Sequence, residues 1–162
     1  MTIRSASLAD GLLIHELTQK IWTGRVSPES TVFRETPETV TAQIAKGGAA
    51  ILEVGGEAIG AGRFVFVSPP ANGEGRWIEI KRIGILPGRQ KAGLGRLILE
   101  ALEEAGLAAG AEGAQLAVRT DQPKLVAYYS ASGYALADDV ILTTPNPRSP
   151  DPVGMRKWFR QA

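Results

Sequence analysis

The sequence contains no cysteine, which excludes disulfide bonds, cysteine-bound metals and a thiol nucleophile. Histidine is nearly absent as well, and the one copy, His15, lies in an apolar stretch that predicts a half-buried helix position. We assign it no role and expect no metal site. A large excess of positive or negative charge is also missing, because 18 basic and 17 acidic residues leave a net charge of +1. The sequence therefore predicts no large electrostatic attraction to nucleic acid.

Long hydrophobic runs are missing too. No stretch of 18 apolar residues could form a transmembrane helix, and no charged segment followed by an apolar one resembles a signal peptide. We therefore expect a soluble, cytoplasmic protein with no membrane partner. The length of 162 residues fits one domain, residues 1–162, that buries a sizeable core.

Glycine is plentiful, and its most informative cluster is the segment Gln90-Lys91-Ala92-Gly93-Leu94-Gly95. This segment follows an apolar run that ends at residues 85–87, and it precedes a helical pattern. Glycine lets the backbone approach a ligand closely, and the first N–H groups of a helix have no partners inside the helix. Such groups suit an anion. With Lys91 and Arg96 as positive charges, the segment predicts a pyrophosphate site, and hence a nucleotide-like cofactor.

Two common phosphate-binding motifs do not match this segment. A Walker loop needs Lys and then Ser or Thr directly after its last glycine, whereas Gly95 precedes Arg96 and Leu97. A dinucleotide fingerprint needs a further glycine or alanine where this chain has Ile98. A glycine turn that merely joins a strand to a helix stays open as an alternative, because Gly-x-Gly alone is a short motif.

A longer pattern around this segment is more specific. Residues 83–95 resemble the acetyl-CoA motif of the GNAT N-acetyltransferase superfamily, in which an apolar residue, any residue and Pro precede Gln/Arg-x-x-Gly-x-Gly/Ala. Residues 127–134 resemble a second region of the family, with Tyr129 and the pair Gly133-Tyr134 in register. The resemblance is strongest over residues 79–134.

The resemblance implies a GNAT fold, which is an α/β domain with a mixed, largely antiparallel twisted sheet of about seven strands flanked by helices. Periodicity and turn residues predict elements in the matching order β-α-α-β-β-β-α-β-α-β-β. The expected strands are residues 2–6, 49–54, 57–67, 76–86, 115–119, 134–143 and 153–159. The expected helices are residues 11–22, 37–46, 93–109 and 123–132. Asp10 is the expected cap of the first and Thr36 that of the second, with Pro37 at its first position and Gly47-Gly48 at its end. The third is expected to pack an apolar stripe on the sheet, formed by Leu94, Leu97, Ile98, Ala101, Leu102 and Ala105. In this fold the fourth and fifth strands splay apart, and the cofactor enters the gap between them.

The cofactor that the resemblance implies is acetyl-CoA, as a co-substrate. Its expected contacts are Ile83, Gly84, Ile85, Gln90, Lys91, Ala92, Gly93, Leu94, Gly95, Arg96, Gln122 and Tyr129. The segment 83–85 maps to a bulge in the fourth strand whose backbone N–H meets the acetyl oxygen, with Ile85 as the expected donor. Gln122 stands where many members have asparagine, and its extra methylene and the following Pro123 weaken that contact.

A base is one requirement of acetyl transfer, because an amine with an ordinary pKa of about 10.4 must lose a proton. Glu79 lies six residues before Ile85, where some GNAT members have a catalytic glutamate. An ion pair of Glu79 with Lys81 or Arg63 on the sheet surface is the alternative, and so is a solvated amine without a protein base. Other members use an acid on the fifth strand, but this chain has Ala117 there.

A proton donor for the leaving thiolate is a second requirement. Tyr129 matches the family tyrosine whose hydroxyl lies near the CoA sulfur, so the resemblance implies that Tyr129 is the general acid. A packed aromatic that only shapes the pocket is the alternative. The neighbouring Tyr128 is expected to point about 100° away on a helix.

These observations predict an N-acetyltransferase that moves an acetyl group from acetyl-CoA directly to a primary amine in a ternary complex. The lack of cysteine argues against a cysteinyl acetyl-enzyme. A non-catalytic acyl-CoA-binding or sensing module on the same fold is the alternative. The expected partner is a small-molecule or peptide amine, and a homodimer stays open. Arginines and aromatics in residues 22–33, 68–76 and 143–153, the expected walls of the acceptor site, suggest an acceptor that carries a carboxylate.

Overall fold

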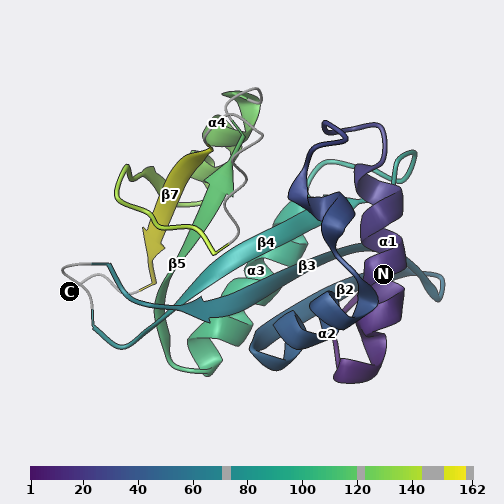
Figure 1. Ribbon diagram of the computed structural model, residues 1–162, viewed down its shortest axis with the longest axis horizontal. Helices are drawn as coiled ribbons and strands as arrows, with labels where there is room; N and C mark the ends of the chain where they lie inside the picture. The colour runs from purple at the N-terminus through teal and green to yellow at the C-terminus, as the bar shows by residue number, and fades with distance from the viewer. Residues whose placement is uncertain (71–73, 120–122, 144–151, 160–162) are drawn as a thin grey trace.

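The computed structural model describes residues 1–70, 74–119, 123–143 and 152–159 (Figure 1). Its strands are β1 (Thr2–Ser5), β2 (Gly47–Val54), β3 (Glu57–Val67), β4 (Arg76–Ile85), β5 (Ala111–Val118), β6 (Ala135–Leu136) and β7 (Val153–Trp158). Its α-helices are α1 (Gly11–Trp22), α2 (Pro37–Ala45), α3 (Leu94–Ala108) and α4 (Pro123–Ala131). Two short 3-10 helices, η1 (Leu8–Asp10) and η2 (Thr31–Arg34), precede α1 and α2. The predicted order of strands and helices is confirmed.

The seven strands form one sheet in the order β1-β2-β3-β4-β5-β7-β6. Only β4 and β5 pair in parallel, and the other neighbours are antiparallel. The expected mixed, largely antiparallel sheet is thereby confirmed. The single parallel pair requires a crossover, which α3 supplies because it connects β4 to β5.

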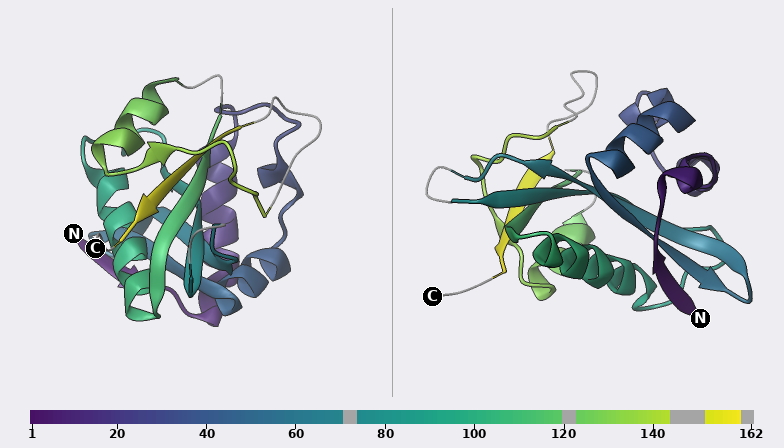
Figure 2. Two further views of the ribbon diagram at one scale, coloured as in Figure 1. Left: turned by 90° about the vertical axis from the view of Figure 1, so that its left-hand side faces the viewer. Right: turned by 90° about the horizontal axis from the view of Figure 1, so that it is seen from below.

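Helices cover both faces of the sheet. Figure 2 shows α1 and α2 on one face and α3 on the other. The largest core cluster lies between α3 and the sheet, where Ile98, Leu99 and Leu102 are buried with Ile78. A second cluster joins Ile14 of α1 to the apolar residues of α2 and β2. Burial on both faces explains why the central strands read as nearly continuous apolar runs.

The apolar stripe of α3 agrees with the predicted one only in part, because Leu97 and Ala105 are exposed. Leu94, Ile98 and Leu102 are buried at four-residue spacing, as their periodicity predicts. Leu97, expected on the same stripe, is 38% exposed, whereas Leu99 is buried. The stripe therefore drifts around the helix toward Leu99.

The helix caps agree with the prediction for α2 and differ for α1. Thr36 accepts a hydrogen bond from Thr39 N at 3.1 Å, and Pro37 occupies the first turn of α2. Asp10 stands at the N-cap of α1, but its carboxylate accepts from Arg4 and from Ser7 N rather than from α1. Asp10 therefore links the first strand to the helix entry instead of capping the helix.

The strand bounds differ from the prediction at β2, β5 and β6, and β5 begins at Ala111 rather than at residue 115. Gly47 and Gly48, expected to end a helix, begin β2 instead. Strand β3 comes so close at this point that a Cβ at Gly47 would lie 1.9 Å from the carbonyl oxygen of Phe64, so the position needs glycine. The expected strand 134–143 is reduced to β6, two residues long. Residues 137–143 instead cross toward β4 and β5, where Gln115 and Glu79 bind them.

Within the described ranges, no helix combines the length and the apolar composition that crossing a membrane requires.

Candidate active site

A gap opens between β4 and β5 in the middle of the sheet. Their parallel pairing runs from Arg76 opposite Ala111 to Glu79 opposite Gln115. Beyond that pair, β4 continues to Ile85 and β5 to Val118 without pairing, and Figure 1 shows the two strands diverging. The splay of the fourth and fifth strands is therefore present, and Glu79 lies at its closed end.

A bulge in β4 lines this gap. Lys81 pairs with Arg63 and Gly84 pairs with Ala61, so two residues of β4 oppose the single Gly62 of β3. Past the bulge, Leu86 N donates to Ile59 O of β3 at 2.7 Å. Successive N–H groups of a strand point to opposite edges, so the N–H of Ile85 points away from β3 and toward the gap.

The bulge also brings α1 close to the strand. A Cβ at Gly84 would lie 2.6 Å from Ile21 and 3.4 Å from the ring of Trp22. Only glycine fits at this position without a shift of the helix. The glycine of the predicted segment 83–85 thus has a packing reason, namely the close approach of α1.

The glycine segment 90–95 joins β4 to α3 as predicted. Gly93 has φ 88°, a left-handed conformation that favours glycine, and α3 begins at Leu94. The side chains of Lys91 and Arg96 are exposed beside the helix N-terminus. Gln90 donates to Ile85 O at 3.4 Å, which ties the segment to the end of β4. Arg89 points elsewhere, since its guanidinium binds Glu57 at the start of β3.

Tyr128, which we expected to point away, reaches this helix N-terminus. Its hydroxyl lies 3.4 Å from the Cβ position of Gly95. The hydroxyl is buried and has no hydrogen-bond partner among the described residues. Burial raises the pKa of Tyr128, with Arg96 lowering it in part, so the hydroxyl stays protonated at neutral pH. A buried donor therefore faces the first turn of α3.

Glu79 is buried and fully engaged, with 3% of the residue exposed. Its carboxylate accepts from Gln115 Nε2 at 2.9 Å and from Thr143 N at 3.2 Å. The Thr143 hydroxyl also donates to it. The nearest cation is Lys81, 3.8 Å away. The ion pair with Lys81 is thus present, but Glu79 lies inside the protein rather than on the sheet surface, and Arg63 binds other residues.

Lys81 completes a polar group at the closed end of the gap. Its Nζ donates to Thr143 Oγ1 at 2.8 Å. Burial lowers the pKa of Lys81, while the charge of Glu79 raises it in part. The Thr143 hydroxyl therefore lies between an ammonium and a carboxylate, accepting from one and donating to the other.

Tyr129 lies in an aromatic row on α4 and beyond it. Its ring contacts Tyr128 and Tyr134, with ring centroids 5.1 and 5.9 Å apart. Burial raises the pKa of Tyr129 to about 12. No hydrogen bond joins Tyr129 to Glu79 within the described part of the chain. Gln122, the other expected contact of this region, falls outside the described residues.

The profile of the Acetyltransferase (GNAT) family matches residues 14–134 of the sequence. The chain belongs to this family. The match covers both the glycine segment and the tyrosine region on which the resemblance rested. A comparison with curated protein sequences finds no significant match.

Solved structures share the GNAT fold at low sequence identity. PaiA N-acetyltransferase from Thermoplasma acidophilum, in complex with coenzyme A, has a TM-score of 0.72 and 16% identity over 98% of this chain and all of its own. Naa20 from Chaetomium thermophilum, bound to a bisubstrate analogue, has a TM-score of 0.66 and 24% identity over 98% of this chain and 86% of its own. Arabidopsis thaliana Naa50, bound to the bisubstrate analogue CoA-Ac-MVNAL, has a TM-score of 0.68 and 13% identity over 98% of this chain and 100% of its own. At these identities the likeness shows the fold.

The expected acceptor walls of this GNAT domain come together only in part. Trp22 lies against the bulge, and Arg25 stacks on its ring at 5.4 Å. Arg76 lies at the opposite end of β4, where it stacks on Phe66 at 4.8 Å. Arg76 therefore does not border the bulge. Arg148 falls outside the described residues.

The sequence reasoning missed Gln115, Thr143 and Tyr128. Gln115 and Thr143 lie 36 and 64 residues from Glu79, so no local spacing relates them to it. A polar residue in the apolar run of β5 was the one available signal for Gln115. Helix geometry alone predicts that Tyr128 points away from Tyr129, and it does not predict that the Tyr128 hydroxyl reaches Gly95.

Proposed function

We propose that this GNAT chain, as a single domain over residues 1–162, is an acetyl-CoA-dependent N-acetyltransferase that transfers directly to a primary amine in a ternary complex. One observation carries the proposal: the β4–β5 gap has Glu79 at its closed end, the outward N–H of Ile85 along its edge and the α3 N-terminus just beyond. These three features supply a base, a donor for the acetyl oxygen and a pyrophosphate site along one strand and its following turn.

The cradle at α3 fits acetyl-CoA by its chemistry. Its N-terminal N–H groups and the exposed Lys91 and Arg96 suit a pyrophosphate. The partnerless hydroxyl of Tyr128 offers one more donor at the same place. The complexes of the structural neighbours with coenzyme A and with bisubstrate analogues support this assignment. Acetyl-CoA supplies the thioester, and the side chains of this chain manage the protons.

Glu79 is the base in this proposal, and Thr143 connects it to the amine. An amine that takes the place of Lys81 Nζ at the Thr143 hydroxyl would pass its proton through that hydroxyl to Glu79. The neutral amine nitrogen then bonds to the acetyl carbon, the carbon–sulfur bond breaks, and the nitrogen releases its second proton to solvent as the amide forms. The N–H of Ile85 faces the oxygen that becomes negative during the attack.

Tyr129 donates to the leaving thiolate. With a pKa of about 12 it remains protonated at neutral pH, so the hydroxyl is available as a donor. An ordinary thiol has a pKa of about 8.5, which makes complete proton transfer from such a tyrosine uphill. A strong hydrogen bond to the thiolate, completed by a proton from solvent, is the role that this pKa favours.

The acceptor is a small-molecule or peptide amine, and the region around Trp22 favours one with a carboxylate or carbonyl group. The indole N–H of Trp22 is buried without a partner among the described residues. Arg25, exposed beside it, provides a positive charge next to the bulge. Peptide N-termini belong to the candidates, given the peptide portion of the analogue bound to Naa50.

A thiol-release screen with acetyl-CoA tests the proposal over amino acids, peptides, polyamines and antibiotics. We expect release that depends on one class of amine, with amino acids and peptides ahead of polyamines. Release that is equal with and without every amine would contradict the proposal.

A non-catalytic acyl-CoA-binding module is the second candidate, and the engagement of Glu79 favours it. A carboxylate that is 3% exposed and already bound by Gln115 and Thr143 is poorly placed to meet an amine directly. Calorimetry of CoA binding, together with the thiol-release screen, separates the enzyme from the binding module. CoA binding without thiol release across the whole panel would favour the binding module.

A further inference from the structure

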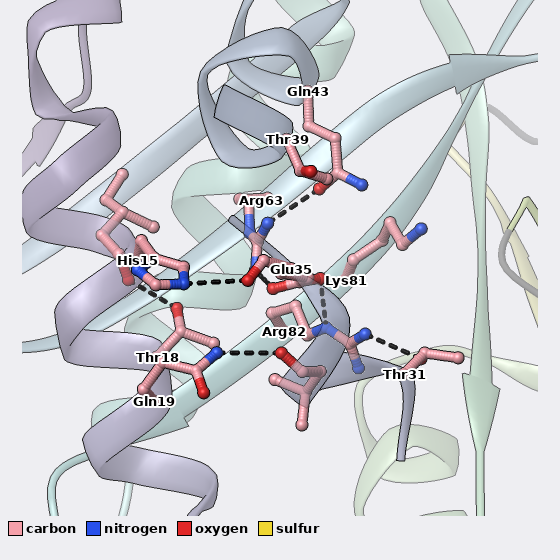
Figure 3. Close-up of polar contacts among 12 residues, drawn as sticks. His15, Thr18, Gln19, Thr31, Glu35, Thr39, Gln43, Arg63, Lys81 and Arg82 are labelled. Carbon is pink, nitrogen blue, oxygen red and sulfur yellow. Dashed lines mark hydrogen bonds and ion pairs between the residues drawn. The ribbon is translucent and has the colours of Figure 1, made fainter. Parts of the chain in front are cut away.

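A buried ionic cluster joins residues 31–35, the loop before α2 that contains η2, to the β4 bulge (Figure 3). Glu35 follows η2 in this loop, and each of its carboxylate oxygens binds a different arginine. Arg63 Nη2 of β3 lies 2.8 Å from Oε1, and Arg82 Nε of β4 lies 3.0 Å from Oε2. The side chains of Glu35, Arg63 and Arg82 are 7%, 0% and 18% exposed. A carboxylate shared by two neighbouring strands therefore fixes the loop to both.

Further contacts hold the same loop from α1 and α2. Arg63 Nη1 donates to Gln43 Oε1 of α2 at 2.8 Å. Gln19 Nε2 of α1 donates to Val32 O at 2.9 Å, and His15 Nε2 lies 3.0 Å from Glu35 O. The loop 31–35 is thus anchored through its backbone carbonyls as well as through Glu35.

The charges of the cluster keep Glu35 ionised. Burial alone would raise its pKa, but the guanidinium groups of Arg63 and Arg82 outweigh burial and lower the pKa. Each guanidinium meets a different oxygen, so neither competes with the other for the carboxylate.

Arg82 is also a backbone outlier. Its φ is 59°, and it is the one non-glycine residue with positive φ in the described part of the chain. It is one of the two residues that form the bulge opposite Gly62. A side chain rarely adopts this conformation without compensation. The compensation is visible here, since Arg82 binds Glu35 and also donates from Nη2 to Thr31 Oγ1 at 3.0 Å.

We propose that Glu35 and Arg82 are positioning residues, which hold the β4 bulge in the shape that turns the Ile85 N–H into the gap and which tie that shape to the acceptor-side loop 31–35. The inference rests on the proposed function, because the bulge matters for catalysis only if the Ile85 N–H meets the acetyl oxygen. It adds that the acceptor loop and the acetyl site move as one unit.

The variant Arg82→Gly tests this directly. Glycine adopts φ near 59° without strain, so the backbone can keep its path while the contacts to Glu35 and Thr31 are lost. Arg82→Lys keeps the positive charge but cannot bind Glu35 and Thr31 in the same fork. Arg4→Gly is the matched control, because Arg4 also pairs with two carboxylates from a strand, at the far edge of the sheet.

Two readouts are needed: steady-state kinetics and amide hydrogen exchange. For Arg82→Gly we expect kcat to fall about 10- to 100-fold, as misplaced catalytic groups do, with KM for acetyl-CoA within about twofold of the wild type. The kcat of Arg82→Lys should lie between those of Arg82→Gly and the wild type, and Arg4→Gly should keep the wild-type kcat. Exchange should accelerate together in residues 31–35 and 83–86 of Arg82→Gly.

Either of two results would overturn the inference. A kcat within twofold of the wild type would show that the bulge needs no such support. A lower kcat with unchanged exchange in both segments would assign Arg82 a direct contact instead of a positioning role. A wild-type protein without turnover on any amine would remove the proposed function, while the exchange data would still decide whether the two segments are coupled.

Discussion

Glu79 and Tyr129 lie in opposite kinds of surroundings: Glu79 is buried among polar groups, and Tyr129 is partly buried among aromatic rings. Glu79 lies among donors, with the amide of Gln115 and the backbone and hydroxyl of Thr143 around one carboxylate. Tyr129 lies among aromatic rings, which stabilise the neutral hydroxyl and disfavour the phenolate. In the proposed mechanism Glu79 accepts the proton of the amine, and Tyr129 donates a hydrogen bond to the leaving thiolate.

Removal of the proposed base should slow the enzyme most at low pH. In Glu79→Gln we expect the rate near pH 7 to fall about 100-fold, the lower end of what a general base contributes. The deficit should shrink as the pH approaches about 10.4, because more of the amine is then neutral without help. Rates with the best amine of the screen, measured from pH 6 to 10, check this.

Thr143→Val is the companion variant for the Glu79 prediction. Valine removes the hydroxyl that connects Lys81 to Glu79 and leaves the backbone N–H of residue 143 in place. We expect a smaller loss with the same pH trend. A Glu79→Gln profile parallel to the wild type at every pH would exclude Glu79 as the base.

Tyr129→Phe should lower kcat about 10- to 100-fold and leave the affinity for CoA unchanged, since only a hydrogen bond to the leaving group is lost. Because the pKa of Tyr129 is about 12, the wild type should show no loss of activity from this residue below about pH 11. Tyr134→Phe is the control: the Tyr134 hydroxyl binds Glu103 at 2.8 Å, so its loss should affect stability and not turnover. Equal losses of kcat and CoA affinity in Tyr129→Phe would instead indicate packing.

The candidate residues themselves were predictable from short motifs, but their partners were not. The Gly93 turn depends on neighbours in the chain, and its left-handed backbone follows from glycine. The contacts of Glu79 depend on residues brought in by β5 and by the segment before β7. Such contacts form only after the sheet has assembled, and the two Arg63 and Arg82 pairs with Glu35 are of the same kind.

At the level of the elements, periodicity predicted helices well and the last hairpin poorly. The Thr36 cap of α2 is a local feature and agrees with the prediction, as do the buried positions Leu94, Ile98 and Leu102 of α3. The expected strand 134–143 has alternating apolar residues, yet only β6 pairs with β7. The reason is competition, because Ile141 O and Thr143 N bind Gln115 and Glu79 instead of a neighbouring strand.

The link between β1 and the entry of α1 should depend on pH through Asp10. Hydrogen bonds from Arg4, and then from Ser7, lower the pKa of Asp10 from 3.8 to about 2. A carboxyl whose folded pKa is depressed stabilises the fold above its unfolded pKa and loses that contribution as the pH falls through the folded pKa. Arg4 is 39% exposed, so we discount the effect for solvent screening to about 1 kcal/mol.

Urea unfolding of Asp10→Asn at several pH values checks this contribution. Relative to the wild type, the variant should be about 1 kcal/mol less stable at pH 7, and the difference should shrink below about pH 4 and vanish only below about pH 2. Asp138→Asn, at an exposed loop position, is the control and should match the wild type throughout. A difference that stays constant with pH would show that the charge of Asp10 contributes nothing.

At the level of the whole molecule, the sheet arranges the site. Six strand pairings join the seven strands into one sheet, and β4 and β5 separate past Glu79. The α3 crossover that makes this one parallel pair also delivers its N-terminus to the end of β4. Family membership could be read from the sequence because these parts are adjacent along the chain, from Glu79 to Tyr129.

The most direct test of this account is a stoichiometric one. The purified protein is incubated with acetyl-CoA and the best amine of the screen, and free thiol and acetylated amine are measured by absorbance and mass spectrometry. Direct transfer predicts one amide for each thiol released, with no acetylated protein when the amine is left out. Bound CoA without any amide product, or an acetylated protein that forms before the amine is added, would contradict it.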